Sequence, residues 1–182
     1  AVVSSYVLSE RFGFAQGFGH FDADFSQADV PDGMRHWEGH VVEGKFHGRA
    51  DDTTRRALEA AIGAATVGNR IGDISHAVAE VARADGLSIN TDFGGHGVGR
   101  EMHGDPHVPN DGKPGRGYPL RDGLVLALEP WFLQSTDKLV TDKDGWTLRS
   151  ADGSRGAHSE HTIAITDAGP VVLTDRSHLG VD

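Results

Sequence analysis

Hydrophobic residues recur every three or four positions between residues 51 and 86, which is the spacing of amphipathic helices. The recurrence breaks at Gly68-Asn69 and stops at Gly86, so it predicts two consecutive helices. Their apolar stripes comprise Leu58, Ala61, Ile62 and Ala65 in the first helix and Ile74, Ala77, Val78 and Val81 in the second. The expected N-terminal caps are Asp51, Asp52 and Thr53 for the first helix and Asp73 for the second.

Beyond Gly86 the pattern changes to short apolar runs separated by turn residues, which is typical of strands. The predicted strands are residues 124–129, 139–140, 146–148, 161–165 and 171–173. Turns at residues 142–145 and 167–170 join neighbouring strands into hairpins. Two helices followed by a hairpin-connected antiparallel sheet predict an α+β fold.

The first 48 residues alternate aromatic residues with glycines and carry a turn signal at Pro31-Asp32-Gly33, which predicts short strands and loops. His20, Asp22 and Asp24 would share one face of such a strand. A polar strand face explains these three residues better than a cation site, because no partner motif accompanies them. The chain length of 182 residues predicts a single domain that spans residues 1–182.

Composition narrows the class of protein. The chain has 27 acidic and 17 basic residues, and its formal charge of -10 argues against nucleic acid as a partner. Cysteine is absent, so disulfides and thiolate metal sites are excluded. No apolar run is long enough to span a bilayer, and the first residues lack the order of a signal peptide, so we expect a cytoplasmic protein.

Three side chains in the second part of the chain are of types that bind divalent metals. His96 lies in the glycine-rich run FGGHGVGREMH, Glu129 ends the apolar run LVLALE before Pro130, and Glu160 precedes HTIAI. A carboxylate at the end of an apolar strand requires a cation or strong hydrogen-bond donors. Taken singly, the other two have ordinary explanations, as a loop histidine and as a residue on an exposed strand edge.

Taken together, the runs GGHGVGREMHGDP, LALEPWF and DGWTLRSADGSRGAHSEHTIAITDAGPVVLT resemble the carboxy-terminal half of the methionine aminopeptidases in order and approximate spacing. The helical segment with VGNRIGDISHAV is similar to the part that precedes this half, particularly in actinobacterial members. The resemblance covers roughly residues 51–174, and the joint occurrence of these motifs is far more specific than any one of them.

This resemblance implies half of a pita-bread fold, in which a curved antiparallel sheet backed by helices holds two divalent ions. The fold would be shortened at its N-terminal half. The resemblance implies that His96, Glu129 and Glu160 are metal ligands, with Glu160 shared by both ions. The implied cofactor is one or two ions of Mn, Co, Fe or Zn. The implied function is removal of N-terminal methionine from peptides or nascent chains.

The resemblance also implies roles in catalysis. A metal-activated water would attack the scissile carbonyl, and Glu129 would carry its proton. His103 matches a histidine that is not a ligand and would donate to the developing oxyanion. Trp146 matches an aromatic wall of the methionine pocket. Met102 would adjust the same pocket, although filling a gap in the core explains it about as well.

This sequence matches the N-terminal ligand segment of the family poorly. In the family, that segment carries two aspartate ligands and a histidine that contacts the substrate. Aligning Phe46-His47-Gly48 with the turn of the family places Glu38 at the first aspartate and Arg49 at the second. Arginine cannot bind a metal ion. Alternatively, Asp51 or Asp52 replaces the missing ligands, although helix capping explains these two residues better.

Two other functions remain open. A catalytically silent relative of the same fold would bind peptides or a protein partner, with Arg49 in the place of a cation. Proline-directed peptide cleavage is the other, and Trp146 and His103 argue mildly against it. Because scarcely more than half of the usual two-part fold is present, apolar sheet surface would stay uncovered, and we therefore expect self-association.

Overall fold

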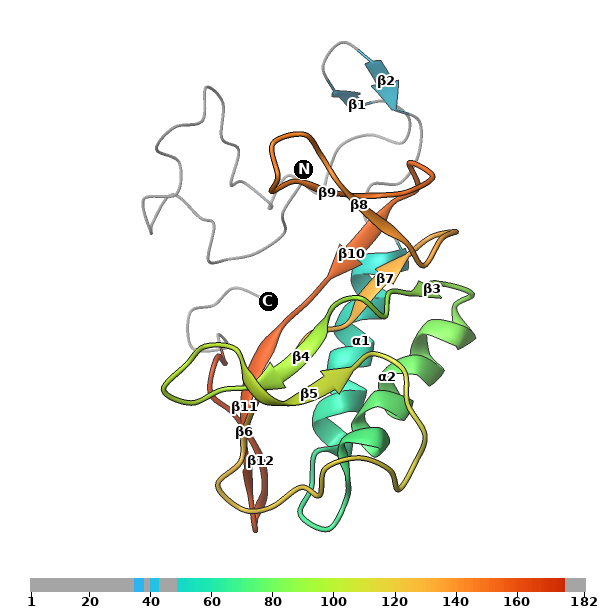
Figure 1. The fold of residues 1–182 in the computed structure, drawn as a ribbon. Coiled ribbons are helices and arrows are strands. Elements are labelled where there is room, and N and C mark those ends of the chain that lie inside the picture. The colour runs from blue at the N-terminus through green and yellow to red at the C-terminus, as the bar shows by residue number, and fades with distance from the viewer. Residues whose placement is uncertain (1–34, 38–39, 43–48, 176–182) are drawn as a thin grey trace. The chain divides into compact units, whose positions relative to one another are not determined.

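The computed structural model describes residues 35–37, 40–42 and 49–175, and its internal contacts divide the chain into two units, Ala1–Gly48 and Arg49–Asp182. In the first unit, β1 (Arg35–Trp37) pairs with β2 (His40–Val42) in an antiparallel hairpin. The positions Glu38, His20, Asp22 and Asp24, and the turn at residues 31–33, lie outside the described residues. The second unit contains every other element (Figure 1).

The two predicted helices are α1 (Arg49–Ala64) and α2 (Ile71–Ala84). Because α1 already begins at Arg49, Asp51, Asp52 and Thr53 lie within its first turns, and their prediction as N-caps is wrong. Acidic residues are favourable in a first turn as well as at a cap, because the helix N-terminus carries partial positive charge. The sequence pattern therefore located the start of α1 only to within a few residues.

The start of α2 was also predicted a few residues too late. Arg70 is the N-cap, and Asp73 is the third helical residue, where its carboxylate accepts the backbone N–H of Arg70 at 2.7 Å. The second oxygen of Asp73 accepts the backbone N–H of Gly115 at 2.8 Å. Asp73 thus stabilises the helix start from inside and fixes the following loop to it.

Ten strands follow α2 in antiparallel pairs: β3 (Ser88–Ile89), β4 (Gly94–Gly97), β5 (Gly104–Pro109), β6 (Val125–Leu128), β7 (Trp131–Leu133), β8 (Leu139–Thr141), β9 (Leu148–Ser150), β10 (Gly156–His158), β11 (His161–Thr166) and β12 (Gly169–Val172). They form a five-stranded sheet in the order β12-β11-β6-β4-β5, a three-stranded sheet in the order β10-β7-β3 and the hairpin β8-β9. The arrangement is α+β, as predicted.

Four of the predicted strands are present as β6, β8, β11 and β12. The strand predicted at residues 146–148 is misplaced, because Trp146 and Thr147 belong to the turn and β9 begins at Leu148. The carboxylate of Asp144 holds this turn by accepting the backbone N–H groups of Trp146 and Thr147, both at 2.9 Å. These local bonds compete with strand pairing.

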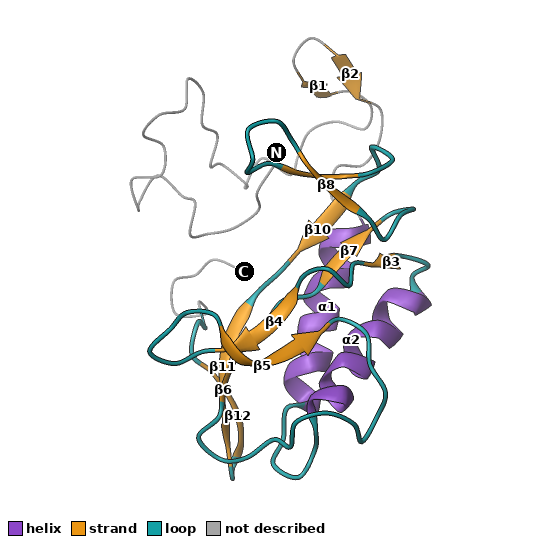
Figure 2. Ribbon diagram, viewed as in Figure 1, coloured by secondary structure: helices purple, strands orange, loops and turns teal. Residues whose placement is uncertain are grey.

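Both helices lie on one side of the sheets, as Figure 2 shows. The core between helices and strands is built from apolar side chains that are almost fully buried, including Leu58, Ala61, Ile74, Val78, Leu126, Leu128, Phe132, Ile163 and Ile165. The hydrophobic stripes of the sequence therefore point into this core.

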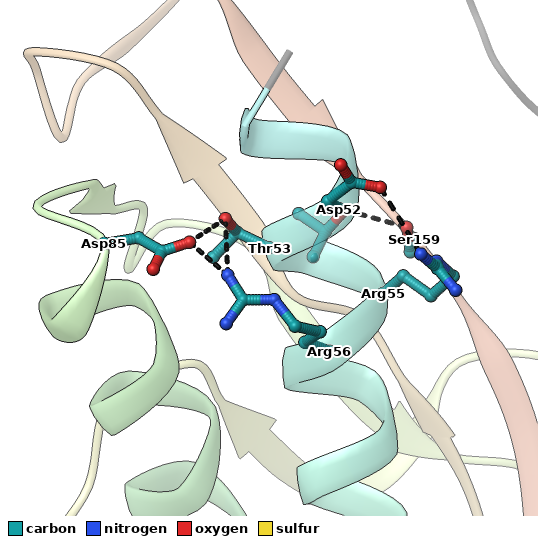
Figure 3. Close-up of polar contacts among 7 residues, drawn as sticks. Asp52, Thr53, Arg55, Arg56, Asp85 and Ser159 are labelled. Carbon is teal, nitrogen blue, oxygen red and sulfur yellow. Dashed lines mark hydrogen bonds and ion pairs between the residues drawn. The ribbon is translucent and has the colours of Figure 1, made fainter. Parts of the chain in front are cut away.

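A polar contact also joins the two helices. The buried hydroxyl of Thr53 on α1 donates to Asp85, just after α2, at 2.5 Å, and Arg56 forms an ion pair with the same carboxylate (Figure 3). On a neighbouring part of α1, Asp52 pairs with Arg55 at 3.3 Å at an exposed position. The Thr53–Asp85–Arg56 contact is the better shielded of the two.

Candidate metal site

Two long stretches of chain run antiparallel through both main sheets and bring two carboxylates together. Leu128 of β6 is paired with His161 of β11, and Trp131 of β7 is paired with His158 of β10. The register is continuous between these two pairs, so Glu129 and Glu160 lie opposite each other at the junction of the sheets. We call this pair of stretches, residues 125–133 and 156–166, the two-stranded ribbon.

Alternation along the ribbon decides which side chains share its face. Glu129 and Trp131 are two residues apart on one strand, and His158 and Glu160 are two residues apart on the other. His96 belongs to the same face, because it is paired with Ala127, which is two residues before Glu129. On the opposite face, the hydroxyl of Ser159 lies 2.9 Å from that of Thr54 on α1. The site therefore faces away from the helices.

Glu129 is the centre of the site. Its Oε1 atom lies 3.1 Å from Nε2 of His96, and its Oε2 atom lies 3.3 Å from Nε2 of His158. The indole N–H of Trp131 donates to the same Oε2 at 3.4 Å. Only 15% of the Glu129 side chain is exposed, so this carboxylate has the polar neighbours that a charge at the end of an apolar strand requires.

Aromatic rings fix one side of this group. The rings of Trp131 and His158 are stacked with centroids 4.2 Å apart, and Phe93 is also stacked on Trp131, with centroids 5.3 Å apart. Trp131 and His158 are also direct partners in the pairing of β7 with β10. Stacking and backbone pairing together restrict the imidazole of His158 to one orientation.

The two carboxylates differ in their pKa. Burial acts to raise the pKa of Glu129, but the nearby His158, with Trp131 and His96, outweighs it and lowers the pKa overall. Partial burial raises the pKa of Glu160, and the negative charge of Glu129 raises it further. The negative charges of two carboxylates in one site repel each other, and a cation between them would relieve this repulsion.

Of the sequence-predicted residues, His96, Glu129 and Glu160 are brought to one face of the sheet. His103 follows β4 and lies beside His96, with ring centroids 4.5 Å apart. Trp146 and Met102, predicted as pocket walls, are 88% and 71% exposed. Because Met102 is exposed, it does not fill a gap in the core, which leaves only the pocket role open to test.

His96 lies on a strand, although the sequence pattern placed it in a loop. The glycines around it form β4, where a Cβ on Gly95 would overlap the carbonyl oxygen of Ala127, and one on Gly97 would overlap that of Asp105. These glycines allow neighbouring strands to approach closely, which is a structural role that glycine-rich sequence alone does not distinguish from a loop.

Of the candidates for the missing N-terminal ligands, only Asp52 has a side chain that the structure describes, and it is not part of this group. Asp52 is exposed and pairs with Arg55. Glu38 and the side chains of Arg49 and Asp51 lie outside what the structure describes, so their predicted roles stay predictions.

His158 is the residue of the site that the sequence patterns did not single out. Its signal was the spacing in His158-Ser159-Glu160, because two potential ligands two residues apart share a face of an extended segment. Each of Glu129, His158 and Glu160 offers an atom that lies within 4.8 Å of the other two. Nε2 of His158 is buried and, among the described residues, has no hydrogen bond. A carboxylate pair with such a nitrogen fits a divalent cation.

Comparison with known proteins agrees with this geometry. Residues 39–167 match the model of metallopeptidase family M24. The chain is 49% identical over 129 residues to methionine aminopeptidase 1 of Mycobacterium tuberculosis (strain CDC 1551 / Oshkosh), covering 68% of this chain and 48% of that protein. It is 45% identical over 140 residues to the methionine aminopeptidase of Aquifex aeolicus (strain VF5), covering 74% of this chain and 54% of that protein.

The fold agrees as well. The crystal structure of the methionine aminopeptidase from Thermotoga maritima superimposes with a TM-score of 0.70 at 44% identity, over 75% of this chain and 56% of that one. The α+β architecture with a helix-backed antiparallel sheet is thus a pita-bread fold, as the resemblance implied. The prolidase from Pyrococcus horikoshii OT3 superimposes with a TM-score of 0.52 at 21% identity. This likeness concerns the fold alone.

Carboxylates and imidazoles cluster on the face of the sheet that points away from the helices, and together with the family match this places the chain among the metallopeptidases. The chain belongs to metallopeptidase family M24. Membership implies the use of divalent metal ions, and Glu129, His158 and Glu160 form a candidate group for them. The chain spans about half the length of the curated relatives it matches. Within the described part, no helix has the length and apolar character needed to cross a membrane.

Proposed function

We propose that this chain acts as a metal-dependent aminopeptidase that removes methionine from the N-terminus of peptides or nascent chains. The observation that carries the proposal is the convergence of His96, Glu129 and Glu160 on one face of the sheet, in a chain 49% identical to a methionine aminopeptidase. No observation favours the catalytically silent alternative.

The residues that would hold the metal are His96, Glu129 and Glu160, as one or two ions of Mn, Co, Fe or Zn. Carboxylate and imidazole donors suit these ions. When bound, such an ion supplies a Lewis acid that polarises a peptide carbonyl and makes a water molecule nucleophilic near neutral pH.

The protein groups around this position have separate tasks. Glu129 stays ionised because its pKa is lowered, so one of its carboxylate oxygens can accept a proton. His103, whose ring lies 4.5 Å from that of His96, would donate a hydrogen bond to the oxygen of the scissile carbonyl. Trp146 and Met102 are exposed and would contact the methionine side chain of the substrate.

A peptide-release assay tests this function. The purified chain is incubated with a Met-Ala peptide and with Mn²⁺, Co²⁺, Fe²⁺ or Zn²⁺ in turn, and free methionine is measured. Glu129→Gln is expected to reduce release by about a hundredfold or more, because it removes a ligand and a proton acceptor. Glu59→Gln, on the exposed surface of α1, is the matched control and should retain the wild-type rate.

Two outcomes would contradict the proposal. One is a wild-type chain that binds metal but releases no methionine with any of the four ions. The other is equal release by the wild type and Glu129→Gln, which would place the chemistry elsewhere. The cytoplasmic location and the absence of a nucleic-acid partner stay predictions from the composition.

A further inference from the structure

His158 is placed like a metal ligand, although the family resemblance did not imply that role for it. Its Nε2 atom lies 3.3 Å from Oε2 of Glu129 and within 4.8 Å of an oxygen of Glu160. The atom is buried, although 32% of the side chain as a whole is exposed. The ring therefore presents one shielded nitrogen to two carboxylates.

The position of this nitrogen is not explained by hydrogen bonding. Nε2 of His158 has no hydrogen bond among the described residues, because its approach to Glu129 is close in distance but not aligned as one. Leaving a buried polar atom without a hydrogen bond is unfavourable. A structural histidine in this place would be expected to form a hydrogen bond in addition to its contact with Glu129.

The separation fits two ligands of one ion. Two donors that each lie about 2.0–2.1 Å from a tetrahedral metal are roughly 3.3 Å apart. Nε2 of His158 and Oε2 of Glu129 have this separation. The stacking of His158 on Trp131 and its pairing in β10 hold the nitrogen there before any ion binds.

We propose that Nε2 of His158 is a ligand of a divalent ion that it shares with Glu129 and Glu160. This inference rests on the proposed metal-dependent function and adds a nitrogen donor to the ligands expected from the family resemblance. An added imidazole increases the preference of the site for Zn²⁺ and Co²⁺ over Mn²⁺ and Mg²⁺. The indole of Trp131 acts beside it as a positioning group, since it contacts both His158 and Glu129.

Cadmium NMR tests this directly. The full chain is labelled with ¹⁵N-histidine and loaded with ¹¹³Cd²⁺, so that a ligand nitrogen shows a scalar coupling to the metal. We expect one such coupled ring signal to disappear in His158→Gln. His76→Gln on α2, outside the group of potential ligands, is the matched control and should keep every coupling.

A second measurement addresses metal preference. Calorimetric titration of metal-free protein should show that His158→Gln weakens Zn²⁺ binding at least tenfold and weakens Mn²⁺ binding less. Backbone amide spectra of each variant show whether it remains folded. The inference is overturned if wild-type protein binds ¹¹³Cd²⁺ without coupling to His158, or if it binds no divalent ion.

Failure of this inference differs from failure of the proposed function. A wild-type protein that releases methionine without coupling between His158 and the metal would retain the function and lose the inference. A protein that shows the coupling but releases no methionine would retain the inference and lose the function.

Discussion

Gly95 and Gly97 determine how closely β4 approaches the strands on either side. A side chain on Gly95 would meet the backbone of β6, and one on Gly97 would meet the backbone of β5. His96 lies between them, so its position next to Glu129 depends on this close packing. The two glycines thus act on the site without any chemistry of their own.

Gly97→Ala tests this dependence. The added methyl group would overlap the carbonyl oxygen of Asp105, and we expect a loss of about 1–3 kcal/mol in the free energy of unfolding. Gly99→Ala is the control, because a Cβ at that position meets no atom within 4 Å. Urea unfolding compares the variants, and equal midpoints for both would refute the packing argument.

Asp144 holds the turn that carries Trp146. Hydrogen bonds from the Thr147 hydroxyl and from the backbone N–H groups of Trp146 and Thr147 lower the pKa of Asp144 to about 2. This pKa is below the ordinary value of 3.8, so the stabilisation is fully present above about pH 4 and disappears as the pH falls through about 2.

The amide signals of Trp146 and Thr147 report this titration. They should shift with an inflection near pH 2 in the wild type, because protonation of Asp144 removes an ionic acceptor. Asp144→Asn should show no such inflection. An inflection near pH 4 in the wild type would mean that the turn bonds are weak in solution.

His158 shows what residue patterns could and could not predict. Glu129 was visible in the sequence because an apolar strand ended in a carboxylate. His96 and Glu160 were singled out as metal-ligand types, and the order and spacing of whole motifs made the assignment specific. The spacing of His158 and Glu160 was a signal in the sequence, but the pairing of β7 with β10 is what brings His158 to Glu129. The register of two paired strands cannot be read from either strand alone.

At the scale of whole elements, apolar packing and the polar contact of Thr53 and Arg56 with Asp85 hold α1 and α2 together. The apolar stripes of both helices were readable from the sequence, because every third or fourth residue contributes to the core. The contact between Thr53 and Asp85 was not, because it joins residues 32 positions apart. The glycine-rich β4 and the short strands β3, β7 and β10 were also not predicted, because two to four residues contain too little periodicity.

Asp85→Ala tests the polar contact between the helices. It removes the acceptor of the buried Thr53 hydroxyl and the ion-pair partner of Arg56, and it should cost about 1–3 kcal/mol of stability. Asp52→Ala is the matched control within α1. Its exposed pair with Arg55 should contribute at most about 1 kcal/mol.

Thermal and urea unfolding of both variants provide the comparison. A cost for Asp85→Ala no larger than that for Asp52→Ala would show that apolar packing alone fixes the two helices. Figure 3 shows both contacts and the different directions in which they leave α1.

At the scale of the molecule, metal binding and folding are linked. Glu129 and Glu160 face each other across the ribbon in the folded chain only, so an ion that they share stabilises the folded state. At a free metal concentration a hundredfold above the dissociation constant, the gain is about 2.7 kcal/mol. We expect Zn²⁺ or Co²⁺ to raise the unfolding temperature of the wild type and to raise that of Glu129→Gln much less.

Scanning calorimetry with and without EDTA measures this difference. Chelation should return the wild type to the unfolding temperature of the metal-free protein. An equal increase for the wild type and for Glu129→Gln would show that the ion binds elsewhere.

Self-association is a prediction for the assembled molecule. Several large apolar side chains are exposed, among them Trp146, Val171 and Leu173. Their burial between copies would be favourable at about 25 cal/mol per Å² of apolar surface. Sedimentation equilibrium should therefore detect a species larger than the 19.4 kDa monomer, and a monomer at all concentrations would disprove the expectation.

The continuous register of the two-stranded ribbon makes the number of residues as important as their identity. One residue inserted between Glu129 and Trp131 would turn the indole toward the helices and move it out of reach of Glu129. Length changes between β7 and β10 would not have this effect, because the intervening hairpin leaves the ribbon and returns to it. Natural insertions and deletions in such chains should therefore collect in residues 134–155 and avoid the two carboxylate-bearing junctions.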